Sequence, residues 1–128
     1  MQVRAKSKFV RVSPYKLRPI VSAVKGHSVE KALAWLRNCA LKKVNPIIKT
    51  IHSAYSNGKN LDSTVSTAAD LFIKDIRVDQ GPVVKYHKPG AMGRASLQRK
   101  RFSHVEVVLQ KTSDGQKIKE EKKAVVKK

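Results

Sequence analysis

Six cations lie between Asp79 and Glu106, and no acidic residue interrupts them. Lysine and arginine gathered in this way neutralise phosphates, and each contact with a nucleic acid releases a bound counterion. His87 and His104 stand in the same stretch without a thiol or carboxylate beside them, so phosphate contact, base contact or plain packing is a better interpretation than a metal site. The six cations are Lys85, Lys88, Arg94, Arg99, Lys100 and Arg101.

The elements on either side of this stretch predict a β-hairpin. Strand-like runs occupy 71–78 and 105–109, and the turn formers Pro89 to Gly93 lie midway between them. About 10–12 residues per strand at ~3.3 Å each reach roughly 35–40 Å. A compact domain of this size has a radius of gyration of only about 14 Å. We therefore expect an arm over about 80–105 that projects from the body toward a polyanion.

A second cationic cluster surrounds an expected helix start. Ser13 is a suitable N-cap and the proline after it a suitable first residue. Arg11, Lys16 and Arg18 lie around this start, where free backbone N–H groups and the helix dipole favour phosphate. The alternative is an ordinary cap with solvated side chains. Aromatic residues in both clusters are either base-stacking or packing residues: Tyr15, Tyr86 and Phe102.

Composition excludes several other classes of protein. The chain of 128 residues has 28 Lys and Arg against 9 Asp and Glu, a formal net charge of +19. Nucleic acid is the expected counter-charge, because no membrane-spanning run, lipidation signal or basic amphipathic helix is present. A single cysteine, Cys39, fits a reducing cytosol and excludes an internal disulfide. We find no catalytic motif and no metal-binding carboxylate pair, and we expect no cofactor and no catalytic residue.

The first half of the chain alternates between predicted elements with clear boundaries. A strand is expected over 2–12, followed by a helix from Pro14 that stops at Gly26. Pro19 predicts either a kink in this helix or a helix that begins only after it. A second helix starts after Ser28, with an apolar stripe extending to Ala40.

A third helix is expected over 43–55, ended by Asn57 and Gly58, with a polar connection over 59–70. The order of strand, three helices and two strands predicts an α+β fold, with three helices packed on a small antiparallel sheet. We expect one domain over 1–110 and a disordered, lysine-rich tail over 111–128.

Three ordered motifs make the chain resemble a known family. They are RVSPYKLR at 11–18, the D-x-G-P sequence at 79–82, and the return MGRA…RKRFSH at 92–104. Over about 3–110 the sequence is similar to large-subunit ribosomal protein number twenty-two. The resemblance implies a cytoplasmic monomer within the large ribosomal subunit that binds 23S-type ribosomal RNA, contacts neighbouring ribosomal proteins and aids assembly. It also implies a hairpin whose tip lines the exit tunnel beside the nascent polypeptide.

The resemblance assigns roles to matching positions. The residues expected to contact RNA are Arg11, Ser13, Lys16, Arg18, Lys85, His87, Lys88, Arg94, Arg99, Lys100, Arg101 and His104. The residues expected at the tunnel wall are Gly90, Ala91, Met92, Gly93 and Arg94.

Two alternative functions follow from the residues themselves. A DNA-architectural protein also uses basic β-arms with a proline near each tip, although such proteins are usually smaller and dimeric. A small RNA-processing enzyme would use His87, His104 and Arg94, but the stretch offers no acidic residue as a general base.

Overall fold

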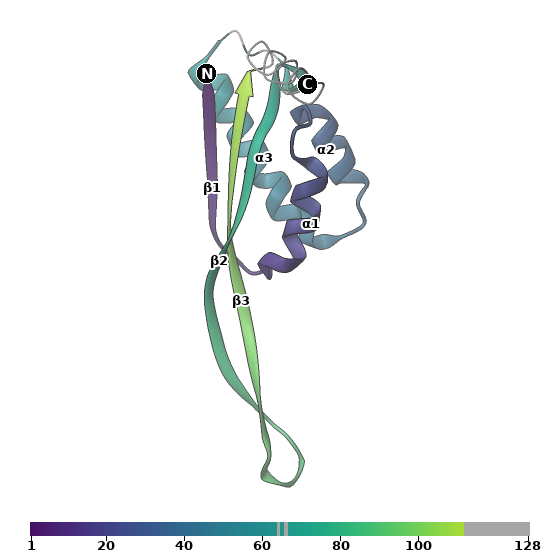
Figure 1. Cartoon of the computed structure of the whole chain (residues 1–128), viewed down its shortest axis with the longest axis vertical. Helices are drawn as coiled ribbons and strands as arrows, with labels where there is room; N and C mark the ends of the chain where they lie inside the picture. Colours follow the sequence, from purple (N-terminus) through teal and green to yellow (C-terminus); the bar gives the residue numbers. More distant parts are fainter. Residues whose placement is uncertain (64, 66, 112–128) are drawn as a thin grey trace, which may run out of the picture.

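The computed structural model describes residues 1–63, 65 and 67–111, so the predicted tail beyond Lys111 lies outside the described residues. Three helices pack on a three-stranded antiparallel sheet of order β1-β3-β2, and a long ribbon extends away from them (Figure 1). This confirms the predicted α+β class. The strands are β1 (Gln2–Val10), β2 (Leu71–Pro89) and β3 (Ala95–Lys111), and the helices are α1 (Pro14–Val24), α2 (Val29–Asn38) and α3 (Asn45–Leu61). None of the described helices is long and apolar enough to cross a membrane.

The central strand β3 organises the core. Its inner half alternates fully buried Val105, Val107 and Leu109 with half-exposed residues on the opposite face. This period of two places one apolar face under the helices and leaves the other face open. The helices contribute buried side chains such as Leu17, Leu36, Ile47 and Ile51 to the same cluster.

Helix α1 begins where the sequence predicted and continues through its internal proline. Ser13 takes the N-cap position, and its carbonyl accepts a hydrogen bond from the Lys16 N–H at 3.0 Å. The helix runs unbroken from Pro14 past Pro19, so a start after that proline is wrong. Pro19 lies on the exposed side, where its ring meets solvent rather than the core. Gly26 then ends the helix with a φ of 82°, as predicted.

Helix α2 is shorter than its predicted apolar stripe. It ends at Asn38, with Cys39 as the C-cap, and Ala40 lies outside it and exposed. Cys39 is half-buried against the core, consistent with a small packing residue. Trp35 keeps 45% of its surface exposed on the outer side of the helix.

The third helix corrects the predicted stop at Asn57 and Gly58. Helix α3 passes through both residues and ends at Leu61. Gly58 is buried, and a Cβ on it would lie 3.1 Å from Leu71 Cδ1. Asn57 donates from its side-chain amide to the carbonyl of Arg4 at 3.1 Å. The glycine therefore allows the helix to approach the sheet closely, and the asparagine holds it there. The polar connection begins only after this helix.

We expect Gly58→Val to lower the free energy of unfolding by about 1–3 kcal/mol, because overpacking displaces buried neighbours. The added side chain would press on Leu71 and on Val3, whose Cγ2 lies 3.6 Å from the position of the new Cβ. Lys59→Val is the matched control, because it introduces the same β-branched residue at an exposed position of the same helix. Equal loss in both variants, measured by urea denaturation, would show that helix propensity rather than close packing is responsible.

Strands β2 and β3 form one continuous ribbon. Their pairing runs from Leu71 opposite Lys111 to Pro89 opposite Ala95. The inner pairs belong to the sheet, and the outer pairs extend beyond the helices as an arm (Figure 1). The register shifts between Gln80 and Val83, at the root of the arm. Such a bulge accommodates a proline, which cannot donate to the ladder, and Pro82 occupies it.

Candidate nucleic-acid interface

The arm presents cations on both of its faces. Residues directly opposite each other share a face, and faces alternate along each strand. Lys85 pairs with Arg99, and Arg101 follows two residues further along the same face. Lys100 pairs with Val84 on the other face, which also carries Lys88. All five side chains are exposed except that of Arg101, which is half-buried at the root. A polyanion on either side of the ribbon therefore meets positive charge.

An aromatic ring lies within this cationic surface. Lys100 Nζ lies 4.9 Å from the centroid of the Tyr86 ring, a cation–π contact across the two strands. Tyr86 keeps 42% of its surface exposed. The sequence identified both residues but not their contact, because the contact depends on the shifted register beyond the bulge.

The tip is a tight loop with two left-handed residues. Ala91–Gly93 forms a 3₁₀ turn, and the Gly90 N–H donates to the Arg94 carbonyl at 2.7 Å to close the loop. Met92 has a φ of 55° and leaves 98% of its surface exposed at the end of the arm. Gly93 has a φ of 70°, a conformation that suits glycine. The thioether and the Arg94 guanidinium are thus both available to a partner.

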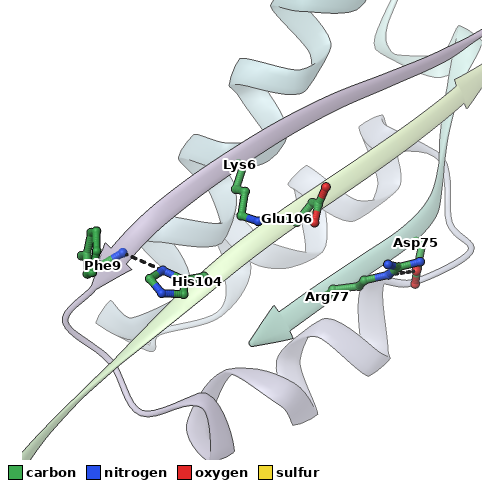
Figure 2. A network of polar contacts seen from close by, with 6 residues as sticks. All are labelled: Lys6, Phe9, Asp75, Arg77, His104 and Glu106. Carbon is green, nitrogen blue, oxygen red and sulfur yellow. Dashed lines mark hydrogen bonds and ion pairs between the residues drawn. The ribbon is translucent and has the colours of Figure 1, made fainter. Parts of the chain in front are cut away.

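The two histidines of the stretch do not face each other. His87 pairs with Leu97 near the tip, whereas His104 pairs with Asp79 inside the sheet. The Phe9 backbone N–H donates to His104 Nδ1 at 3.0 Å, and the two rings meet edge to face with centroids 4.9 Å apart (Figure 2). The pairing that closes the tip, Pro89 opposite Ala95, leaves His87 close to the tip and His104 well inside the sheet.

The cations around the start of α1 lie next to the arm. Arg11, Lys16 and Arg18 are exposed, and the Arg18 guanidinium lies 5.4 Å from the Tyr15 ring centroid. Arg11 also lines a surface hollow of about 510 Å³ together with Lys100 and Arg101. Arg11 therefore links the two cationic clusters of the sequence at the arm root.

Two acidic residues of the sheet, Asp75 and Glu106, form ion pairs away from the arm. Asp75 accepts from Lys25 Nζ at 2.6 Å and from Arg77 Nε at 2.9 Å, on the part of β2 that precedes the arm (Figure 2 shows the Arg77 contact). These hydrogen bonds, with that of Lys25 the larger, lower the pKa of Asp75 below its usual value. The stability they add is therefore complete at neutral pH and is lost only in acid, as the pH falls through the lowered pKa. The Nζ atom of Lys6 lies 3.9 Å from Oε2 of Glu106 on the same open face of the sheet.

Within residues 1–63, 65 and 67–111, no three His, Cys, Asp or Glu residues gather as a metal site would require. The surface instead consists of exposed cations, interleaved aromatic rings and a tip with small residues. The fold and this surface define a strongly basic α+β protein with a projecting cationic β-ribbon, the class of protein that contacts a polyanion.

Comparison with known proteins identifies the family. Residues 5–110 match the sequence model of the family described as Ribosomal protein L22p/L17e, and the chain belongs to this family. It is 40% identical over 114 residues to the large ribosomal subunit protein uL22 of Desulfitobacterium hafniense, which covers 89% of this chain and 98% of that protein. The uL22 protein of Syntrophobacter fumaroxidans is 43% identical over 109 residues, covering 85% of this chain and 97% of its own length.

The protein is accordingly a structural constituent of the large ribosomal subunit and not an enzyme. The family resemblance noted from the three sequence motifs is confirmed, and the ribosomal interpretation replaces both the DNA-architectural and the RNA-processing alternatives.

Proposed function

We propose that the protein binds the RNA of the large ribosomal subunit through the arm and through the cations around the start of α1, and that it aids folding of that RNA during assembly. The observation that carries this proposal is the acid-free arm with cations on both faces. Like charges paired across a ribbon destabilise it in isolation, and phosphates placed between them remove that repulsion. Neighbouring ribosomal proteins contact the remaining surface of the single domain, which spans about residues 1–110.

The tip lines the nascent-peptide exit tunnel in this proposal. Its small residues, Gly90 to Gly93, allow close approach to a surrounding RNA wall, and the exposed Met92 offers an apolar, adaptable contact to a passing polypeptide. Arg94 is placed to contact phosphate beside it. Family membership supports the location of the chain in the large subunit, and the shape and charge of the arm support its insertion into RNA.

Cosedimentation of the tagged chain with ribosomal subunits in its own cells tests this function. We expect one copy per large subunit in moderate salt. Photo-crosslinking from a reactive side chain at position 92 is expected to label both ribosomal RNA and stalled nascent chains. Crosslinks only to RNA would restrict the tip to a structural role, and migration away from the large subunit would contradict the proposal as a whole.

A further inference from the structure

A second cationic hollow lies at the end of β1, outside the arm. It has a volume of about 330 Å³ and lies between the end of β1 and the first turn of α3. Arg11 lines both this hollow and the hollow at the arm root, so the two are neighbours on one surface. We call it the β1-end hollow. Its charged lining residues are Lys8, Arg11 and Lys49, and none of its lining residues is acidic.

Phe9 is the aromatic residue in the lining of the β1-end hollow. It leaves 59% of its surface exposed, which is unusual for a phenylalanine in a strand. Its backbone has a φ of 56°, a conformation that residues other than glycine seldom adopt. Such strain persists only where the surroundings enforce it and is found most often at functional sites.

His104 fixes the position of the Phe9 ring. The Phe9 N–H bonds to His104 Nδ1 at 3.0 Å, and the rings meet edge to face at an interplanar angle of 85° (Figure 2). Because Nδ1 accepts this hydrogen bond, the proton of the neutral imidazole resides on Nε2. The ring of Phe9 is therefore held in place before any ligand arrives, although much of it remains open to solvent.

The chemistry of the β1-end hollow suits one nucleotide of a single strand. A base stacks on an exposed aromatic ring, and the phosphates on either side are neutralised by nearby cations. The volume lies at the low end of the roughly 300–1,000 Å³ of ligand pockets, which fits one unstacked nucleotide and not a duplex. By contrast, the hollow on the open sheet face, of about 240 Å³, has Asp75 and Glu106 beside its cations and no aromatic residue in its lining.

We propose that the β1-end hollow binds one unstacked nucleotide of single-stranded RNA, with the base on Phe9 and its flanking phosphates on Lys8, Arg11 and Lys49. This inference rests on the proposed RNA-binding function and adds a stacking contact with a base to it. The arm needs only phosphates, whereas this site needs a base.

A tryptophan at position 9 provides a local test. Trp35 is the only native tryptophan and lies on α2, so the variant Phe9→Trp is made in a Trp35→Phe background. Titration with a uridine decamer is expected to quench the fluorescence of the new tryptophan, because a stacked base does so. An abasic decamer with the same number of phosphates is expected to bind more weakly and to leave the fluorescence unchanged.

The native ring is tested by substitution in the full chain. We expect Phe9→Leu to weaken binding of the uridine decamer by about 5- to 150-fold, the range found when a stacking aromatic is removed. Phe9→Tyr is expected to retain affinity, and Trp35→Leu, which removes an exposed aromatic elsewhere, is the matched control. Thermal unfolding of each variant confirms that the fold persists.

Equal quenching by the abasic decamer, or affinity in Phe9→Leu no lower than in Trp35→Leu, would overturn the inference. Stronger quenching by an acidic peptide than by the uridine decamer would also overturn it and assign the β1-end hollow to a protein partner. Failure of the proposed function is distinguishable, because the unmodified chain would then fail to bind both the decamer and ribosomal RNA.

Discussion

Replacing five cations of the arm by glutamine is expected to lower the affinity for large-subunit ribosomal RNA by about 10³-fold at 0.1 M salt. Each lost phosphate contact removes about 0.7–0.9 from the slope of log K against log salt, so the slope is expected to become shallower by about 4. The reason is that these side chains are exposed or half-exposed and occupy both faces of the ribbon. Filter binding across 50–400 mM salt measures both quantities. The residues are Lys85, Lys88, Arg99, Lys100 and Arg101.

A second variant with the same change in net charge controls for non-specific attraction. Five lysines near the C-terminus are replaced by glutamine: Lys117, Lys119, Lys122, Lys123 and Lys127. We expect this variant to lose much less affinity, because net charge alone does not place cations between phosphates. Equal losses in both variants would mean that the RNA responds to total charge and that the arm has no special role.

Gly81→Val is expected to lower the free energy of unfolding by about 1–3 kcal/mol and to weaken RNA binding with it. A Cβ at this position would lie 3.0 Å from the backbone carbon of Phe102 and 3.1 Å from its carbonyl oxygen. Backbone atoms of a paired strand cannot move aside as the end of a side chain can. The strands must therefore separate at the bulge, where the arm joins the sheet.

Gln80→Val is the control for Gly81→Val, because Gln80 is exposed and adjacent in the same strand. Chemical denaturation measures the stability of both proteins, and amide exchange measures protection along the outer part of β3. We expect the amides between Ala95 and Arg101, in the outer part of β3, to lose protection in Gly81→Val alone. An unchanged exchange pattern in that variant would show that the bulge tolerates a side chain and does not direct the arm.

The features that the sequence predicted well depend on local chemistry. The turn formers at 89–93 and the Gly26 stop each act over a few residues, and the acid-free run is visible directly in the sequence. Together they identified the hairpin and the end of α1. Whether the individual RNA-contact residues act as the family resemblance implies stays a prediction. The grouping of Arg11, Lys100 and Arg101 around one hollow at the arm root, and the exposed cations on both faces of the arm, are consistent with it.

The features that the sequence missed depend on contacts between distant segments. Gly58 resembles a helix stop in sequence, but the structure needs a glycine there because the sheet packs closely against the helix. Phe9 and His104 are 95 residues apart in the chain, so their hydrogen bond follows only from the pairing of β1 with β3. The bulge at the arm root shifts the register by a residue and decides which cations share a face. Charge content was therefore predictable, and its arrangement was not.

The regular pairing of β2 with β3 beyond the bulge, from Val83 opposite Arg101 to Pro89 opposite Ala95, also sets a rule for the length of the arm. Each residue pair adds about 3.3 Å of reach and turns its side chains to the opposite face. Deleting one pair would shorten the ribbon and also interchange the surfaces that carry Lys85 and Lys88. Deleting two pairs keeps each surface in place and draws the tip back by about 6.6 Å. The reach of such an arm can thus change without disturbing its contacts only in steps of two pairs.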